Sequence, residues 1–214
     1  MINRKPTVVT EPREARHELR ELGLTPEIIQ GIAKAASAAR TDSLPVDPCS
    51  APGTQAYIHG VRSIRLQLLP LGWRMSRAGN VESTVNDELG IQLCFQNVDQ
   101  ACREKDPEAI SGKGSGSRKL IHDGRQTELF VKNETTNTKN FGSTPTVWVV
   151  CVSTDAKNVC AEVSCPHTFE GEQFDGFSKR IFIVDEAIDP NPGKANKPDD
   201  GDDEADYEVR ISKK

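Results

Sequence analysis

The sequence predicts an α+β fold in which two to three N-terminal helices pack on one face of a mostly antiparallel sheet of six to seven strands. Up to about residue 69, apolar residues recur at helical spacing. From Gly72 onward they alternate instead, in short runs separated by turn residues. Helices and strands that are apolar on one side only are typical of a two-layer arrangement.

Three segments carry helix signals. Residues 11–22 are mostly charged, with few apolar anchors, which predicts an exposed helix. Residues 25–40 start with the N-cap residue Thr25 followed by Pro26 and carry an apolar stripe. The third helix is expected over residues 53–69, before Pro70.

The remaining apolar runs read as strands. A meander is predicted first, with turns AGN and DELG, and then a hairpin around STDAKN. The expected strands cover residues 73–75, 81–85, 91–95, 146–152, 159–165 and 180–184. Between them, residues 103–119 are a charged, Gly/Ser-rich loop, and residues 120–132 fit either a helix or a strand. No strand–helix–strand alternation is visible, so a doubly wound sheet is not expected.

Composition divides the chain into four regions. Residues 1–23 are expected to be flexible or partner-dependent, and residues 24–188 form a single α+β domain. Residues 189–206 read as an acidic disordered linker. Residues 207–214 are expected to return as a C-terminal edge strand, because Tyr207, Val209 and Ile211 alternate.

Charge and hydropathy restrict the function classes. The net charge is −5 at pH 7, and residues 185–214 account for all of it. Residues 1–184 are therefore neutral overall, which argues against polybasic binding of duplex DNA. No apolar run reaches the ~18 residues of a membrane span, and the N-terminus lacks the apolar region of a secretory signal. A cytoplasmic protein with its six cysteines reduced is expected, with no membrane role.

The loop from Gly112 to Ser117 contains the anion-binding candidates Lys113 and Gly114, to which Arg180 is added from a later strand. Glycines allow backbone amides to turn toward an anion, and lysine supplies a positive charge. The loop is not a Walker A motif, because Lys113 is followed by glycine rather than Ser or Thr. A plain surface connection is the competing interpretation.

Glu162 is the candidate catalytic residue, because a carboxylate in mid-strand is unusual if that face is buried. A metal-dependent nuclease needs acid-x-Lys on such a strand, and Glu162 is followed by Val-Ser. The pattern therefore favours a Glu162 that faces solvent or pairs with Arg180 across the sheet. Zinc at Cys160, Cys165 and His167 is not favoured, because a second ligand pair is missing, and neither a metal nor another cofactor is expected.

Arginines are the remaining candidates for binding. Arg62, Arg65, Arg74 and Arg77 are predicted to form a local basic surface if the fold brings them together, and nucleic acid is the partner such a surface would suit.

Several fragments resemble a family of small uncharacterised bacterial proteins from mobile or accessory DNA, often encoded beside an Xre-type regulator with an ImmA/IrrE-type metallopeptidase. The similar fragments are VDPCSAPG (46–53), LLPLGW (68–73), ISGKGSG (110–116), TELF (127–130), AEVSCP (161–166), KRIFI (179–183) and EVRISKK (208–214). The chain departs from the family at residues 95–106. The resemblance implies a cytoplasmic accessory or phage-defence protein and assigns no activity.

The function expected from these observations is a non-enzymatic regulatory or protein-interaction component of a bacterial mobile-element or phage-defence module, with a protein partner. The exposed charged helix and the acidic linker motivate it. The alternative is an enzyme acting on a nucleotide or nucleic acid, resembling a metal-dependent nuclease, with Lys113 on phosphate and Glu162 as acid/base or metal ligand.

Overall fold

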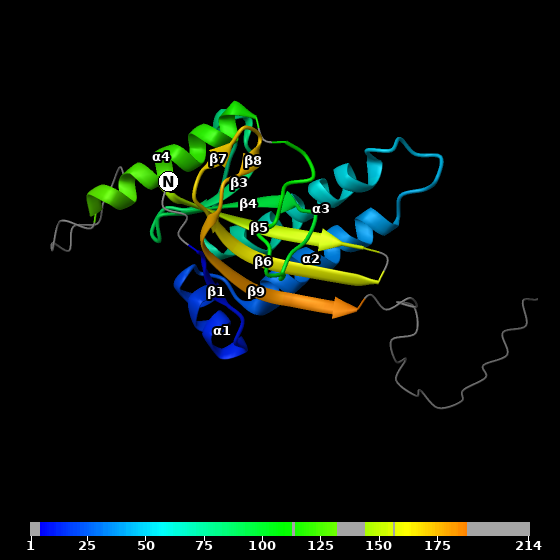
Figure 1. Cartoon of the computed structure of the whole chain (residues 1–214), viewed down its shortest axis with the longest axis horizontal. Helices are drawn as coiled ribbons and strands as arrows, with labels where there is room; N and C mark the ends of the chain where they lie inside the picture. The colour runs from blue at the N-terminus through cyan, green and yellow to red at the C-terminus, as the bar shows by residue number, and fades with distance from the viewer. Residues whose placement is uncertain (1–4, 113, 132–143, 156, 188–214) are drawn as a thin grey trace, which may run out of the picture.

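The computed structural model describes residues 5–112, 114–131, 144–155 and 157–187, which form an α+β fold (Figure 1). The helices are α1 Pro12–Glu21, α2 Pro26–Thr41, α3 Ala51–Leu68 and α4 Ser115–Val131, with short 3-10 turns η1 Leu69–Leu71 and η2 Ala78–Asn80. The strands are β1 Thr7–Val9, β2 Arg74–Ser76, β3 Ser83–Asn86, β4 Ile91–Asn97, β5 Thr146–Thr154, β6 Asn158–Pro166, β7 Phe169–Glu170, β8 Gln173–Phe174 and β9 Phe177–Ala187.

Seven strands form one sheet in the order β1-β9-β6-β5-β4-β3-β2. Neighbours are antiparallel except for two parallel pairs, β1 with β9 and β4 with β5. The predicted meander corresponds to β2, β3 and β4, and the predicted hairpin to β5 and β6. The predicted fold class, with N-terminal helices on a mostly antiparallel sheet, is therefore confirmed.

Helices α1, α2 and α3 cover one face of the sheet, where the larger core lies. The Thr25 side chain accepts a hydrogen bond from the Ile28 amide (3.4 Å), so it caps α2 as the sequence predicts. In α3, Gly60 lies against the ring of Phe95 on β4, and a Cβ there would fall 2.4 Å from the ring. A glycine at this position therefore allows the helix to approach the sheet closely.

In the described part of the N-terminal region, β1 and α1 are packed against the domain, unlike the flexible segment predicted for residues 1–23. Strand β1 extends the sheet beside β9. In α1, Leu19 is fully buried, and Glu18 forms an ion pair with Lys179 of β9 at 2.7 Å. The sequence pattern predicted an exposed helix here because only two residues of the ten-residue helix are buried.

Helix α4 corrects one expectation and decides between two others. Residues 115–119 belong to the helix rather than to the predicted loop, and residues 120–131 are helical, which is one of the two alternatives left open for this segment. Because β4 and β5 are parallel neighbours, α4 lies within a strand–helix–strand connection that the sequence did not reveal. The glycines hid the helix start, and one of them is needed there: a Cβ on Gly116 would lie 1.9 Å from the Gly79 carbonyl oxygen.

The second face of the sheet is covered by chain that follows β4. Ile121 of α4 packs there on a smaller core, together with the β7–β8 hairpin. Residues 98–110, called the covering loop here, run across β5, β6 and β9 on this face (Figure 1). The predicted linker 189–206 and the returning strand 207–214 lie outside the described residues.

Candidate functional site

The covering loop is closed at its base. Val98 bridges to Ala109, and the Asp99 carboxylate accepts hydrogen bonds from the amides of Gln100 (2.8 Å) and Glu108 (2.7 Å). The Gln173 side chain, from the β7–β8 hairpin, both accepts from and donates to the backbone of Ala109. These contacts hold the two ends of the loop together, so that its middle lies flat on the sheet.

Under the middle of the loop lies an ion pair between Glu162 of β6 and Arg180 of β9, both with no solvent exposure. Arg180 Nε donates to Glu162 Oε1 at 2.8 Å, and Arg180 Nη2 donates to Oε2 at 2.7 Å. The register places Arg180 opposite Ser164, so the two charged residues are diagonal neighbours on one face. This geometry is the bidentate arrangement that arginine and carboxylate favour.

The carboxylate has two further donors. Ser164 Oγ donates to Oε1 of Glu162, and the Cys102 amide of the covering loop donates to Oε2, both at 2.7 Å. Each oxygen of Glu162 thus accepts two hydrogen bonds. Buried carboxylates are stable when donors surround them in this way.

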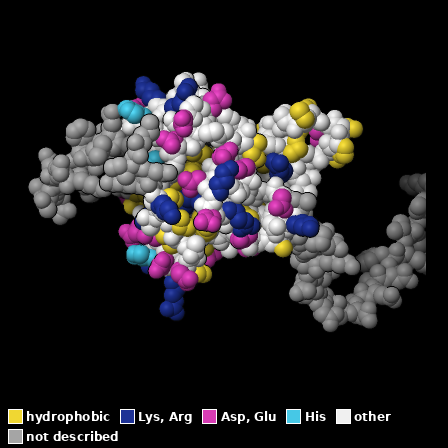
Figure 2. All heavy atoms as spheres, in the orientation of Figure 1, with side chains coloured by type: hydrophobic (Ala, Val, Ile, Leu, Met, Phe, Trp, Pro, Cys, Tyr) yellow, Lys and Arg dark blue, Asp and Glu magenta, His cyan; other side chains and the backbone are white. Residues whose placement is uncertain are grey.

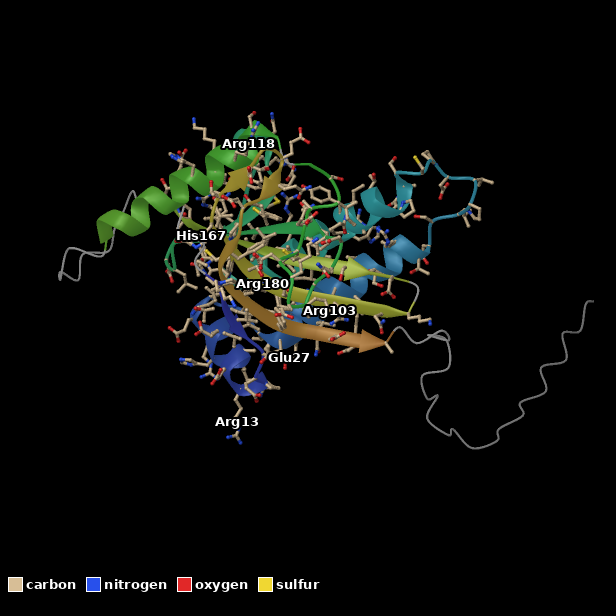
Figure 3. All side chains as sticks on the ribbon, viewed as in Figure 1. Arg13, Glu27, Arg103, Arg118, His167 and Arg180 are labelled. Carbon is tan, nitrogen blue, oxygen red and sulfur yellow. The ribbon has the colours of Figure 1, made fainter. Side chains whose placement is uncertain are left out.

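The remaining nitrogen of the Arg180 guanidinium, Nη1, donates hydrogen bonds to the covering loop. Nη1 donates to the Asp106 carboxylate (3.1 Å) and to the carbonyl oxygens of Lys105 (3.3 Å) and Glu104 (3.5 Å). The guanidinium also lies over the ring of Phe182, 4.9 Å from its centre. Arg180 therefore joins the sheet to the loop, and Figure 3 shows it on the side that the loop crosses.

The charges around Arg180 shift the neighbouring pKa values. Burial raises the pKa of Asp106 above its usual range, and the Arg180 charge opposes this only in part. Burial alone would lower the pKa of Arg180, but its hydrogen bonds and attraction to Glu162 raise it. Arg180 thus stays positively charged under all ordinary conditions.

Two cysteines lie beside the ion pair, and both have raised pKa values. Burial, and then the Glu162 charge, raise the pKa of Cys102 to about 12. The Cys102 thiol donates to the carbonyl oxygens of Ala161 (3.2 Å) and Val184 (3.3 Å). Burial, and then the Asp185 carboxylate, raise the pKa of Cys160 to about 11. Neither thiol is thus activated as a nucleophile, which requires a lowered pKa.

The sequence left two alternatives for Glu162. Its pairing with Arg180 is confirmed, and the prediction that it faces solvent is wrong. The other anion-binding candidates are not brought to Arg180 by any described contact. Gly114 directly precedes α4, and Lys113 lies outside the described residues. A Cβ on Gly112 would lie 2.1 Å from a carboxylate oxygen of Glu172, so the loop has an acidic neighbour that disfavours an anion.

The four arginines predicted to form a basic surface are mostly paired with carboxylates. Arg65 and Arg77 both form ion pairs with Glu82, and Arg74 pairs with Asp87 at 2.6 Å. Local acidic partners therefore reduce the positive charge that this region offers to phosphate.

Metal binding has no candidate set in the part of the chain that the structure describes, where no group of three or more His, Cys, Asp or Glu side chains converges. Cys160 and Cys165 lie in different core clusters, on opposite faces of β6, as their odd spacing predicts. Among the described helices, none combines the length and the hydrophobicity needed to cross a bilayer.

One cavity of about 80 Å³ lies on the second face of the sheet. Its walls are mainly apolar and include Phe169, Phe174 and Ile121, while Tyr57 and Glu82 supply polar groups. Ligand pockets usually have several hundred cubic ångströms, so the cavity suits a few non-hydrogen atoms at most.

The sequence located the charged pair but missed the loop residues that complete the site, Cys102 and Asp106. The contribution of Cys102 to Glu162 comes from its backbone amide, which leaves no mark in the sequence. A usable signal was the alternation of Cys160, Glu162 and Ser164 on one strand face. Three polar or polarisable groups on a buried face require a covering segment with its own donors.

Comparison of the chain with family models, with curated proteins and with solved structures found no match.

Proposed function

We propose that this chain is a non-enzymatic regulatory or protein-interaction component of a bacterial mobile-element or phage-defence module, and that it works in the cytoplasm with a protein partner. The mobile-element setting follows from the family resemblance. The choice of an interaction role over catalysis is supported chiefly by one observation: both oxygens of the buried Glu162 already accept two hydrogen bonds each.

A metal-dependent nuclease needs carboxylate oxygens that face a metal ion and a water molecule. In this chain the Glu162 oxygens face Arg180, Ser164 and the covering loop, with no solvent exposure. A catalytic role would require the loop to leave the sheet and Arg180 to release the carboxylate. The described contacts favour a structural role, in which the pair holds the loop in place.

A surface suited to a protein partner lies at the turn between α2 and α3, residues 43–48, called the tip here. Leu44 is 62% exposed and Val46 is 87% exposed. The Leu44 amide donates to the Asp47 carboxylate at 2.8 Å, and the Asp47 amide donates to the Leu44 carbonyl oxygen at 3.0 Å. Figure 2 shows yellow apolar side chains gathered at this projecting end of the molecule.

The tip is ordered before any partner arrives, because side-chain and backbone hydrogen bonds close its turn. Apolar side chains that gather on an exposed surface are one mark of a protein-interaction site. Asp47 in the tip and Asp42 directly before it are both exposed, and their charges oppose approach to an anionic membrane surface. A protein with an apolar pocket suits the tip better.

Co-purification from the native host tests the proposal. The tagged full chain should retain a partner that the variant Leu44→Asp/Val46→Asp loses. Leu66→Asp on α3 is the matched control, because Leu66 is 69% exposed and lies outside the tip. A wild-type chain that stays monomeric without a partner would contradict the proposal.

The enzymatic alternative is tested separately, by incubating the chain with DNA, RNA and nucleotides with and without Mg²⁺ or Mn²⁺. Unchanged substrates are expected under all conditions. Turnover that Glu162→Gln abolishes in a folded variant would favour the alternative instead.

A further inference from the structure

Helix α1 carries its charges in two separate rows. At 100° per residue, Arg13, His17 and Arg20 lie on the outer side of the helix, away from the buried residues Ala15 and Leu19, and Arg16 lies at the edge of that side. The acidic side chains Glu14, Glu18 and Glu21 lie together along one flank. The outer side, called the basic row here, consists of Arg13, Arg16, His17 and Arg20.

The basic row is exposed and has no close acidic partner among the residues that the structure describes. None of its four side chains lies within 4.0 Å of a carboxylate oxygen of the described residues. Together with Pro12 they alone line a shallow hollow on the helix surface. In Figure 3, Arg13 points away from the body of the molecule. Arg16 interacts only weakly with Glu27, because its charge contributes least among the effects that lower the pKa of Glu27.

The shape of the row restricts what can bind it. From Arg13 to Arg20 the row is about 10 Å long, at 1.5 Å per residue. An extended peptide advances about 3.3 Å per residue, so three or four residues match its length. A nucleic acid presents phosphates over a wider surface and would also meet the acidic row on the flank. The narrow strip of positive charge therefore favours an acidic polypeptide over DNA or RNA.

We propose that the basic row of α1 is a docking surface for an acidic polypeptide segment of a partner protein. This inference rests on the proposed interaction function and names the chemistry of the partner. The positive charge would attract the segment and speed its association, while the acidic flank would exclude uniformly anionic surfaces.

A synthetic peptide of sequence DDGDDEAD is a suitable probe, since it has the composition that the row should recognise. The same eight residues occur in the chain at 199–206. All proteins in the test are full chains in which the six acidic residues of this segment are changed to their amides, so that the segment does not compete with the peptide: Asp199, Asp200, Asp202, Asp203 and Asp206 to Asn, and Glu204 to Gln.

Fluorescence anisotropy of the labelled peptide should show binding in about 50 mM salt that weakens markedly at about 200 mM. Arg13→Glu/Arg16→Glu should weaken binding by at least about tenfold. The matched control is Arg62→Glu/Lys157→Glu, which makes the same charge change at two other exposed positions and should bind as the parent does. Circular dichroism verifies that both variants are folded.

Three results would overturn the inference: no binding of the peptide at low salt, equal weakening by the control variant, or tighter binding of a 20-bp duplex through the same arginines. The last result would assign the row to nucleic acid. If the tip variants lose the native partner but the peptide does not bind, the inference fails and the proposed function stands. If the peptide binds but no partner co-purifies, the proposed function fails and the row still recognises acidic polypeptides.

Discussion

A buried carboxylate keeps its charge only when donors replace the water it has lost, and Glu162 receives four hydrogen bonds on its two oxygens. One of these donors is an amide of the covering loop. The conformation of the loop and the charge state of the sheet therefore depend on each other. Removing the charge of either Glu162 or Arg180 leaves the other charge buried without compensation.

Glu162→Gln should lower the free energy of unfolding by about 3–5 kcal/mol, because Arg180 then remains buried without its counter-charge. Urea denaturation at pH 7 measures this change. A loss below about 1 kcal/mol would mean that water reaches the pair and solvates Arg180.

Asp106→Asn is the matched variant, because Asp106 is the second carboxylate that contacts Arg180. The raised pKa of Asp106 predicts how the stability of this variant depends on pH. Since burial raises the pKa of Asp106 above its unfolded value, the group contributes stability at low pH and loses that contribution as pH rises through the folded pKa. Asparagine keeps an oxygen for Arg180 and carries no charge. The variant should therefore be at least as stable as the parent at pH 7, and its relative advantage should shrink near pH 4. The opposite trend would show that the charge of Asp106 is needed.

Cysteine chemistry gives a second test at this scale. Iodoacetamide at pH 7.5 should modify Cys49 first, because it is exposed. Cys102, with its pKa raised to about 12, should remain unmodified in the folded chain and react after denaturation. Mass spectrometry of tryptic peptides distinguishes the sites. Early modification of Cys102 would indicate that the covering loop opens readily.

At the scale of elements, the contact between α3 and β4 depends on a missing side chain. Gly60→Ala places a methyl group 2.4 Å from the Phe95 ring and should destabilise the chain by about 1–3 kcal/mol, the usual cost of overpacking. Gly53→Ala in the same helix meets nothing within 4 Å and should be neutral or slightly stabilising. The unfolding temperature should therefore fall for Gly60→Ala and not for Gly53→Ala, and equal shifts would contradict the close contact.

Elements with strong local signals were predictable, and elements defined by distant contacts were not. Thr25 and Pro26 mark the start of α2 in the sequence, and the turn residues mark the β5–β6 hairpin. The start of α4 was hidden because Gly116 is required by the nearby Gly79 backbone, a contact between positions far apart in the chain. Strand β1 has only three residues and one buried side chain, so its pattern is too short to read. For the site, strand alternation indicated Glu162 and Arg180, whereas the loop that covers them depends on backbone donors.

At the scale of the whole molecule, β1 completes the sheet at the edge beside β9. Val9 is 6% exposed and packs in the main core, whereas Val8 is 43% exposed. Val9→Ala should lower the free energy of unfolding by about 1.6 kcal/mol, from roughly 0.8 kcal/mol for each of two buried carbon groups removed. Val8→Ala should change it by less than about 0.5 kcal/mol, as exposed positions do. Chemical denaturation compares the two, and equal effects would show that β1 is not docked in this register.

The parallel pairing of β1 with β9 also sets an order of events during synthesis. The first described strand must wait for residues 177–187 to leave the ribosome before it can find its neighbour. Until then the nascent chain exposes the apolar side of α1 and an unpaired strand, both of which promote aggregation. Contacts between such distant parts of a chain also form slowly, because a long loop must close first. Production of this protein should therefore benefit from chaperones that hold the N-terminal region until residues 177–187 have emerged.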